Sequence, residues 1–279
     1  MLNLEGRTAV VTGGGSGIGR GIVLAAAGAR MTVVVADVET ARAEEVAHEA
    51  RGLGATAIGM HVDVTDRASM CELAERVAAE AGAVHLLCNN AGVFTMGALD
   101  AVRDEAWDWV LSVNLKGVVN GLQAFVPRMR LQSGEKHIVN TASLAGHIAV
   151  PGLGIYNTSK FAVVGLSETL RADLAPHGFG VSVLCPGLVA TNIVDSTRNR
   201  PASLGGHEAP AAEFATRLTR EGMDPLRVGK LVLRGVREDE LYIFTHPEAR
   251  AFVEGRMTAI LEAFDRWSNR VAEAAPNRD

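Results

Sequence analysis

The sequence lacks the residue patterns of metal sites and paired cysteines. Its three cysteines, Cys71, Cys88 and Cys185, occur without any C-x-x-C spacing. Cys88 and Cys185 lie in apolar runs, so we expect them to be buried, reduced core residues. None of the eight histidines belongs to an H-x-x-x-H or H-E-x-x-H pair, and no metal site is therefore predicted.

Long apolar runs and clusters of basic residues are also missing. Nowhere do about 18 apolar residues run together, so no membrane-spanning helix is predicted. The N-terminal segment MLNLEGRTAVV has no basic region followed by a long apolar one, so we expect no secretory signal. The net charge of −5 and the absence of a Lys/Arg cluster argue against nucleic acid as a partner. We therefore expect a cytoplasmic protein that binds neither membrane nor nucleic acid.

What the chain does contain is a regular alternation of two kinds of segment. Apolar, β-branched runs recur at residues 8–13, 31–37, 57–63, 84–90, 137–143, 181–187 and 240–246. Between them lie stretches of helical period rich in Ala, Glu and Arg. Strand, helix and strand repeated in this way predict a parallel sheet covered on both faces. We predict an α/β fold: one Rossmann-like, doubly wound domain over residues 1–279, with about seven parallel strands and helices on both faces.

Two segments depart from this rhythm. Residues 188–225 contain a polar stretch with Gly-Gly and Pro that is too long for an ordinary connection. Loops of that length are usually lids or disordered segments, and we interpret this one as a substrate loop. Residues 247–279 follow the last predicted strand and begin as an amphipathic helix, which we interpret as a C-terminal helical extension. The extension could cover the pocket or alter a subunit interface, and the sequence favours neither.

A glycine-rich turn follows the first predicted strand. In TGGGSGIGRG, Gly13, Gly17 and Gly19 stand directly before a predicted helix. Glycines let the backbone approach a pyrophosphate, and the helix offers free N–H groups and the positive end of its dipole. Asp37 ends the second predicted strand, where a carboxylate can accept hydrogen bonds from an adenosine ribose. The alternative is a helix N-cap or turn aspartate, and the glycine turn makes us favour the ribose.

One of the only two tyrosines stands four positions before a lysine, in YNTSK at 156–160. On a helix this spacing places Tyr156 and Lys160 on one face. A surface pair on an amphipathic helix would have the same spacing. A free tyrosine has a pKa of about 10, and a nearby ammonium group favours the phenolate and lowers that pKa. Ser143, at the end of a predicted strand, could bind the oxygen that Tyr156 protonates or deprotonates.

Taken together, these motifs resemble the short-chain dehydrogenase/reductase family over about residues 5–190. The series runs T-G-x-x-x-G-x-G, Asp63 in HVDVTD, NNAG at 89–92, Asn114 in SVNLKG, Ser143 in NTAS, Tyr156 with Lys160, and PGLVAT at 186–191. The resemblance implies that Tyr156 is the acid/base, that Ser143 binds the reacting oxygen and that Lys160 assists the tyrosine. It also implies that Asn114 supports a water-mediated proton path.

The resemblance further implies an NAD site. Its cofactor-binding residues would be Gly13, Ser16, Gly17, Ile18, Gly19, Asp37, Asp63, Val64, Asn90, Tyr156, Lys160, Val189 and Thr191. Asp63 and Val64 would meet the adenine, and Val189 and Thr191 the carboxamide of the nicotinamide. Simpler interpretations stay open for three positions: Asn114 as a structural helix residue, Asn90 as part of a turn, and Ser143 as a helix N-cap.

The substrate is predicted less sharply. The candidate pocket residues are Phe94, Met96, Leu144, Val150, Leu153 and Leu188, which are mostly apolar. We therefore expect a bulky secondary alcohol or ketone, aromatic or alicyclic, oxidised or reduced with NAD. The rival is an NADPH-dependent carbonyl reductase, which needs a basic residue beside the ribose, where Ser16 and Val38 stand. A regulator that senses NAD without turnover has no need to keep Asn114, Ser143, Tyr156 and Lys160 together, and their joint presence counts against it. His147 receives no role.

The predicted long helices at 102–130 and 156–176 carry more apolar side chains than a sheet can cover. Members of the resembled family commonly pair such helices across two-fold axes. We therefore predict a homodimer or a homotetramer with isologous contacts.

Overall fold

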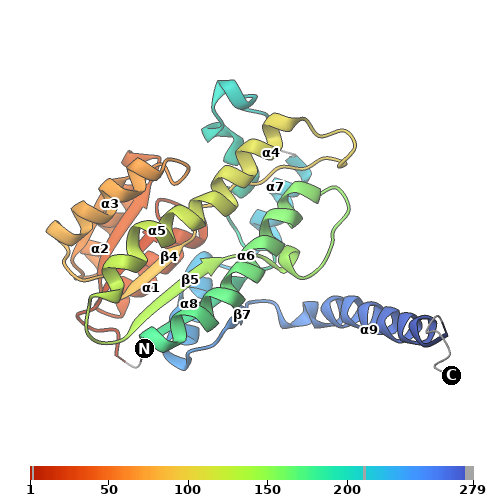
Figure 1. Cartoon of the computed structure of the whole chain (residues 1–279). Helices are drawn as coiled ribbons and strands as arrows, with labels where there is room; N and C mark the ends of the chain where they lie inside the picture. The colour runs from red at the N-terminus through yellow and green to blue at the C-terminus, as the bar shows by residue number, and fades with distance from the viewer. Residues whose placement is uncertain (2, 210–211, 274–279) are drawn as a thin grey trace. The chain divides into compact units, whose positions relative to one another are not determined.

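Seven parallel strands form one sheet in the order β3-β2-β1-β4-β5-β6-β7, as the computed structural model of the chain shows (Figure 1). The strands are β1 (Thr8–Thr12), β2 (Thr32–Asp37), β3 (Ala57–His61), β4 (Leu86–Asn89), β5 (Lys136–Thr141), β6 (Phe179–Cys185) and β7 (Tyr242–Phe244). Val10 of β1 pairs with Val34 of β2 on one side and with Leu87 of β4 on the other. The predicted doubly wound α/β fold is confirmed.

The structure describes residues 1, 3–209 and 212–273. Residues 210–211 of the predicted loop and 274–279 of the predicted extension lie outside the described residues. The chain divides into two units, Met1–Thr245 and His246–Asp279. The sheet and all predicted site residues belong to the first unit. That the whole chain is a single domain stays a prediction.

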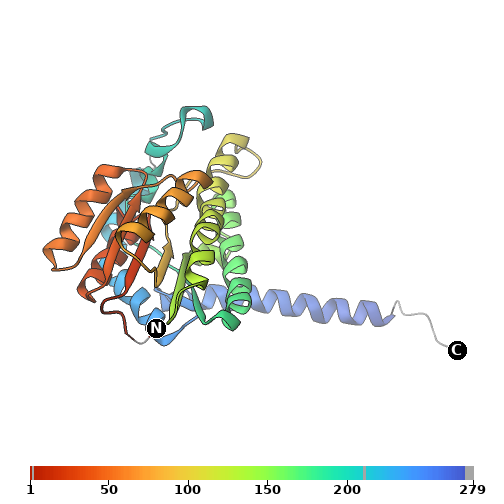
Figure 2. The same ribbon diagram turned by 60° about the vertical axis from the view of Figure 1, so that its left-hand side comes forward.

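Helices cover both faces of the sheet in the first unit (Figure 2). The helices of this unit are α1 (Gly17–Gly28), α2 (Thr40–Gly52), α3 (Arg67–Glu80), α4 (Asp104–Leu111), α5 (Gly117–Arg130), α6 (Gly154–Leu174), α7 (Ala212–Glu221) and α8 (Pro225–Glu238). Successive strand residues point to opposite faces. Val11 accordingly packs in the core beneath α1, α2 and α8, and Val10 in the core beneath α3 and α5. Both faces of β1 are buried, which explains its unbroken apolar sequence.

The topology places one edge of the sheet where a ligand can bind. The chain leaves β1 for β2 on one side and returns to β4 on the other. At such a switch point the loops after adjacent strands diverge and leave a crevice beyond the carboxyl ends. Asp37, Asn89 and Thr141 end β2, β4 and β5 at this edge.

The segment predicted as a substrate loop has helical structure in the part described. It contains the short 3-10 helices η4 (Ile193–Asn199) and η5 (Ala202–Leu204), followed by α7. Ser196 anchors it, because its hydroxyl accepts a hydrogen bond from the Phe94 backbone N–H at 2.9 Å. Val189 forms a parallel bridge with Met223 across the ends of the segment. The predicted plain loop is therefore a compact, partly helical cover.

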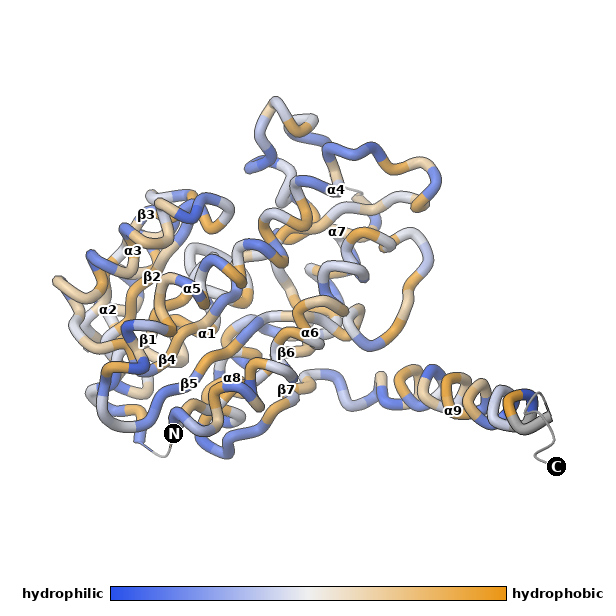
Figure 3. The backbone as a smooth tube through the Cα atoms, in the orientation of Figure 1, coloured by the Kyte–Doolittle hydropathy of each residue, from blue (hydrophilic) through white to orange (hydrophobic). Residues whose placement is uncertain are grey.

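The second unit consists of a 3-10 turn, η6 (Pro247–Ala249), and one long helix, α9 (Arg250–Glu273). Hydrophobic and hydrophilic segments alternate along α9 in Figure 3. Its exposed apolar side chains are Phe252, Met257, Leu261, Phe264, Trp267 and Val271. The predicted amphipathic helix is present. Throughout the described residues, every helix falls short of the combined length and apolarity that crossing a bilayer requires.

Candidate active site

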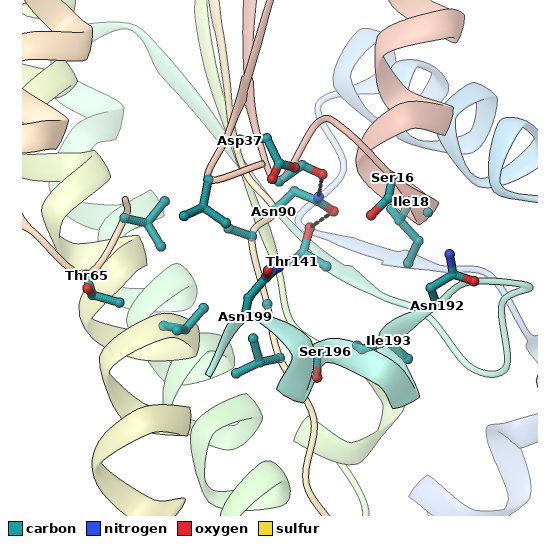
Figure 4. Close-up of a pocket in the computed structure, with 18 of the residues that line it drawn as sticks. Ser16, Ile18, Asp37, Thr65, Asn90, Thr141, Asn192, Ile193, Ser196 and Asn199 are labelled. Atoms are coloured by element: carbon teal, nitrogen blue, oxygen red, sulfur yellow. Dashed lines mark hydrogen bonds between the residues drawn. The ribbon is translucent and has the colours of Figure 1, made fainter. Parts of the chain in front are cut away.

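A cavity of about 240 Å³ lies at the carboxyl edge of the sheet. Most of the residues predicted to bind a cofactor line it: Gly13, Ser16, Gly17, Ile18, Asp37, Asp63, Val64, Asn90, Tyr156, Lys160 and Thr191. Figure 4 shows Ser16 and Ile18 at one end of this pocket, and Thr65 opposite them. Asn192, Ile193, Ser196 and Asn199 contribute the wall that comes from η4 and the residue before it.

The glycine-rich turn has the shape that a pyrophosphate requires. Gly13 and Gly17 adopt positive φ angles of 63° and 50°, a conformation that L side chains rarely adopt. A Cβ atom on Gly19 would lie 2.0 Å from the Gly13 carbonyl oxygen, so only glycine fits there. Ser16 precedes α1 without a side-chain hydrogen bond to the helix, which leaves the first N–H groups of α1 available to an anion. The turn therefore fits the phosphates of a dinucleotide.

Asp37 has both a structural and a ligand-facing position. Its Oδ2 accepts a hydrogen bond from the Gly15 backbone N–H at 2.9 Å, and its Oδ1 accepts one from the Glu39 backbone N–H at 3.0 Å. The side chain thus holds the glycine turn and the β2–α2 turn together. Each carboxylate oxygen can accept a further hydrogen bond, and Asp37 still lines the cavity. The interpretation as a turn residue and the interpretation as a ribose ligand are compatible.

Asp63 and Val64 form the wall expected to face an adenine. Asp63 Oδ1 accepts hydrogen bonds from the Thr65 backbone N–H at 2.9 Å and from the Thr65 hydroxyl at 2.7 Å. The Val64 carbonyl accepts a hydrogen bond from Asn120 Nδ2 at 2.8 Å. The buried Asn120, on α5, therefore supports this wall. Sequence reasoning missed it, because an asparagine within a helix carries no local sign of a partner more than fifty positions away.

Asn90 joins the ends of three strands. Its Nδ2 donates to the Thr12 carbonyl at 3.1 Å and to the Gly13 carbonyl at 3.3 Å, and its Oδ1 accepts from the Thr141 hydroxyl at 3.3 Å. Asn90 therefore fixes the backbone around the glycine turn. At the other end of the site, Thr191 lines the cavity, whereas Val189 is buried outside the lining.

Tyr156 and Lys160 lie on α6 and face the same cavity. The Lys160 ammonium is 5.5 Å from the centre of the Tyr156 ring and donates a hydrogen bond to the Thr141 carbonyl at 2.9 Å. Burial lowers the pKa of Lys160 to about 8, against a smaller opposing effect of Cys185. Lys160 is thus a buried cation in contact with the Thr141 carbonyl and the Tyr156 ring. The alternative interpretation of Tyr156 and Lys160 as a surface pair on an amphipathic helix is wrong.

The direction of the tyrosine shift differs from the sequence prediction. Burial raises the pKa of Tyr156 to about 12, although a hydrogen bond with Ser143 lowers it. We predicted a lowered pKa from the adjacent ammonium group, and that prediction is wrong for this structure because the loss of solvent dominates. Tyr156 is therefore a proton donor over the neutral pH range.

Ser143 and Asn114 both have structural partners. The Ser143 hydroxyl caps the short helix η2 (Leu144–Gly146), accepting from the Ala145 backbone N–H at 3.1 Å, and it also bonds Tyr156. Asn114 lies in η1, a π-helical turn at Ser112–Lys116. Asn114 Oδ1 accepts a hydrogen bond from the Val93 backbone N–H at 2.8 Å, and Asn114 Nδ2 donates one to the Val93 carbonyl at 3.0 Å. The structural interpretation of Asn114 is correct, and a proton path through it stays a prediction.

An aromatic pair stands beside the tyrosine. The Phe94 ring meets the Tyr156 ring edge-on, with centroids 5.1 Å apart, and stacks on Phe214 of α7 at 5.5 Å. Phe94 was predicted as a pocket residue, whereas Phe214 was missed because it lies within a polar segment. The six predicted pocket residues are all described, and none of them lines the cavity itself. Met96 and Val150 are exposed.

His147 has no predicted role, and its contacts are structural. Its Nε2 lies 3.1 Å from the Cys185 sulfur, and its ring packs against Tyr242 and Phe244 of β7. Over the described part of the chain, no three His, Cys, Asp or Glu side chains gather as a metal site would need. The absence of a metal stays a prediction.

Comparison with known proteins agrees with this geometry. Residues 7–202 match the family model described as short chain dehydrogenase. The C alpha-dehydrogenase of Sphingobium sp. is 36% identical over 270 residues, which cover 94% of this chain and 88% of that protein.

Two solved structures are similar over nearly the whole chain. A short-chain dehydrogenase/reductase from Burkholderia phymatum in complex with NAD has a TM-score of 0.90 and 39% identity, over 94% of this chain and 97% of the other. The apo form of LigO from Sphingobium sp. strain SYK-6 has a TM-score of 0.82 and 34% identity, over 96% and 92%. The chain belongs to the short-chain dehydrogenase/reductase family and is an oxidoreductase.

Proposed function

We propose that this protein transfers hydride between NAD(H) and a secondary alcohol or ketone. The observation that carries the proposal is the convergence of Ser143, Tyr156 and Lys160 beside a cavity whose other end is the glycine-rich turn. When bound, NAD accepts or supplies the hydride. The protein has to supply orientation and a proton, and these three side chains suit that task.

In the proposed reaction, the proton moves at the Tyr156 hydroxyl. During ketone reduction the phenol donates its proton to the carbonyl oxygen of the substrate, and during alcohol oxidation the phenolate accepts it. The Ser143 hydroxyl donates a hydrogen bond to the same substrate oxygen and fixes its position. The Lys160 ammonium, 5.5 Å from the ring centre, stabilises the phenolate that forms when the proton leaves. Its pKa of about 8 keeps it mostly charged at neutral pH.

NAD is the proposed cofactor because of Asp37. The carboxylate lines the cavity next to the glycine turn, at the place where an adenosine ribose would accept or donate hydrogen bonds. NADP carries a phosphate of charge near −2 on that ribose. The similar structure from Burkholderia phymatum holds NAD, which supports this choice. The rival, an NADPH-dependent reductase, would draw on Arg42 or Arg198.

A bulky, apolar substrate, aromatic or alicyclic, is proposed for the part of the site around Tyr156. The tyrosine ring already packs against Phe94 in an edge-to-face arrangement, and Phe94 stacks on Phe214, so flat apolar groups have a surface to pack against. The relative from Sphingobium sp. is named a C alpha-dehydrogenase, and that name supports a dehydrogenase activity for this chain. We further propose a homodimer or homotetramer in the cytoplasm, and sedimentation at micromolar concentration tests the assembly.

The direct test of the proposed function is a panel of substrates. Purified protein is incubated with NAD or NADP and with secondary alcohols that range from 2-propanol to 1-phenylethanol and larger aryl and alicyclic carbinols. Absorbance of the reduced nicotinamide reports turnover. We expect NAD reduction that increases with the apolar bulk of the alcohol and falls to background in Tyr156→Phe. The proposal would be overturned if the protein used only NADP, or if it oxidised none of the alcohols in the panel.

A further inference from the structure

Glu39 binds two arginines from different parts of the chain. Its Oε1 accepts hydrogen bonds from Arg198 Nε at 3.0 Å and Nη2 at 2.6 Å, and from Asn199 Nδ2 at 2.9 Å. Its Oε2 lies 2.7 Å from Arg42 Nε. Arg198 and Asn199 belong to η4, 159 and 160 positions further along the chain. A single carboxylate therefore holds two guanidinium groups.

These pairs are better formed than ordinary surface ion pairs. The side chains of Glu39 and Arg198 are only 25% and 22% exposed. Burial raises the pKa of Glu39, but the hydrogen bonds and charges of its partners outweigh this effect and lower the pKa below its usual value. Glu39 is accordingly ionised at neutral pH, and it neutralises charge in a partly desolvated place.

The pairs lie at the ribose end of the cavity. Asp37, Glu39 and Arg198 all line it. The Glu39 backbone N–H donates to Asp37 Oδ1, so the two carboxylates sit on one turn. Arg42 is close as well, because a Cβ atom on Gly15 would lie 2.9 Å from Arg42 Cβ and 3.0 Å from Asp37 Oδ2. Both arginines thus stand next to the carboxylate that would meet the ribose.

We propose that Glu39 is a second determinant of the preference for NAD over NADP, because it holds Arg42 and Arg198 away from a ribose 2′-phosphate. The inference rests on the proposed use of NAD. Asp37 repels the phosphate directly, whereas Glu39 removes the two cations that would otherwise attract it. Guanidinium groups bind phosphate through paired hydrogen bonds, and a guanidinium already bound by a carboxylate is not available for that purpose.

Charge counting shows why Glu39 matters. Asp37 and Glu39 carry two negative charges, and Arg42 and Arg198 carry two positive charges, so the group is neutral. Replacing Glu39 by glutamine leaves one negative and two positive charges, and it frees both guanidiniums to turn toward a 2′-phosphate. The same substitution loosens the contact between η4 and the β2–α2 turn. That loosening weakens the binding of NADH and of NADPH alike. The change in charge affects only the binding of NADPH, which carries the 2′-phosphate.

Binding of NADH and NADPH to the full chain separates these effects. Nicotinamide fluorescence gives the dissociation constant of each without turnover. We expect the ratio of the NADPH constant to the NADH constant to fall about 10-fold in Glu39→Gln, a change typical of removing one opposing charge at a partly buried site. The double variant Glu39→Gln/Arg198→Met should lose most of this gain, which would show that a freed arginine is responsible.

Glu208→Gln is the matched control. Glu208 also binds an arginine of the covering segment, with Oε1 3.1 Å from Arg200 Nη1, but it does not line the cavity. Its substitution should leave the ratio of the two constants unchanged. A ratio unaffected by Glu39→Gln, or changed equally by Glu208→Gln, would overturn the inference. Wild-type protein that binds NADPH more tightly than NADH would instead contradict the proposed use of NAD.

Discussion

The two walls of the cavity are built in different ways. The wall that would face the dinucleotide consists of strand ends and the turn before α1, and its side chains bond mostly to nearby backbone, as Asp37 does with Gly15. The opposite wall, the covering wall, belongs to the segment that contains η4, η5 and α7, and its lining residues lie between Thr191 and Leu204. It is attached by side chains such as Ser196 and Arg198 to residues about a hundred or more positions away. The sheet fixes the position of the first wall, whereas a few long-range side-chain contacts fix the position of the second.

This difference separates chemistry from selectivity. Residues on or near the sheet ends carry the proposed proton transfer and the phosphate-binding turn, and changes there should abolish activity. Residues of the covering wall contact the substrate side through Phe214 and the ribose side through Arg198. Changes there should alter which ligand is preferred while turnover survives.

The largest effect is expected for Tyr156→Phe. The change removes one hydroxyl from a residue of α6 and should lower turnover at least ~10²-fold, the lower range for a positioned acid/base. The thermal midpoint should stay close to that of the wild type. Tyr242→Phe is the matched control, because Tyr242 is the only other tyrosine and its hydroxyl donates to Glu168 at 2.6 Å, away from the cavity lining. Equal losses in the two variants would refute the assignment.

Much of the first wall could be predicted from the sequence. A strand that runs into glycines and a helix leaves little choice of turn, since Gly13 and Gly19 occupy positions where other residues do not fit. Asp37 was expected at its place because it ends the second predicted strand after the glycine turn, and in the structure that strand pairs with β1. Tyr156 and Lys160 were expected together because helical spacing alone places them on one face.

The second wall could not be predicted in the same way. The contact of Phe214 with Phe94 and that of Arg198 with Glu39 depend on the tertiary path of a segment whose sequence has no clear period. The predicted direction of the shift in the Tyr156 pKa was also wrong. The sequence shows the adjacent ammonium group but not the burial that outweighs its effect. Long-range packing and desolvation are properties of the folded chain.

Asp37→Ala tests the first wall at the ribose. With solvent present, the carboxylate should disfavour NADP by about 1–3 kcal/mol, or roughly 5- to 150-fold in kcat/KM. The variant should bind NAD more weakly and should no longer repel the 2′-phosphate of NADP. The difference between the kcat/KM values for NAD and NADP should therefore narrow or reverse. Asp66→Ala is a suitable control, because Asp66 caps α3 outside the cavity lining. A ratio untouched by Asp37→Ala would leave Asp37 as a turn residue only.

The kcat/KM values for alcohol oxidation and for ketone reduction should depend differently on pH, and the value for oxidation should change about 10-fold per pH unit. With a pKa of about 12, Tyr156 is protonated at neutral pH, so the phenolate needed for alcohol oxidation increases as pH rises from 6 to 8. Ketone reduction uses the phenol and should stay flat over this range. Above the Lys160 pKa of about 8 the ammonium is lost, so oxidation should level off and reduction should decline. Profiles of kcat/KM that rise together would contradict this assignment.

The smallest effect is expected for Phe214→Ala in the covering wall. Loss of the stack on Phe94 removes an aromatic contact worth about 0.5–1.5 kcal/mol, so KM for an aryl carbinol should rise about 2- to 12-fold. kcat and the KM for 2-propanol should change little. Phe252→Ala, on the exposed side of α9, provides the comparison. A large loss of kcat in Phe214→Ala would mean that the two walls are not separate in function.

The central claim is that this cavity transfers hydride from a carbinol carbon to NAD. It can be measured with an aryl secondary alcohol that carries deuterium on that carbon, using mass spectrometry of the dinucleotide after one turnover. The account predicts NADH about one mass unit heavier than NADH formed from the unlabelled alcohol, since the label moves with the hydride. NADH without the label, or ketone formed while NAD stays oxidised, would contradict it.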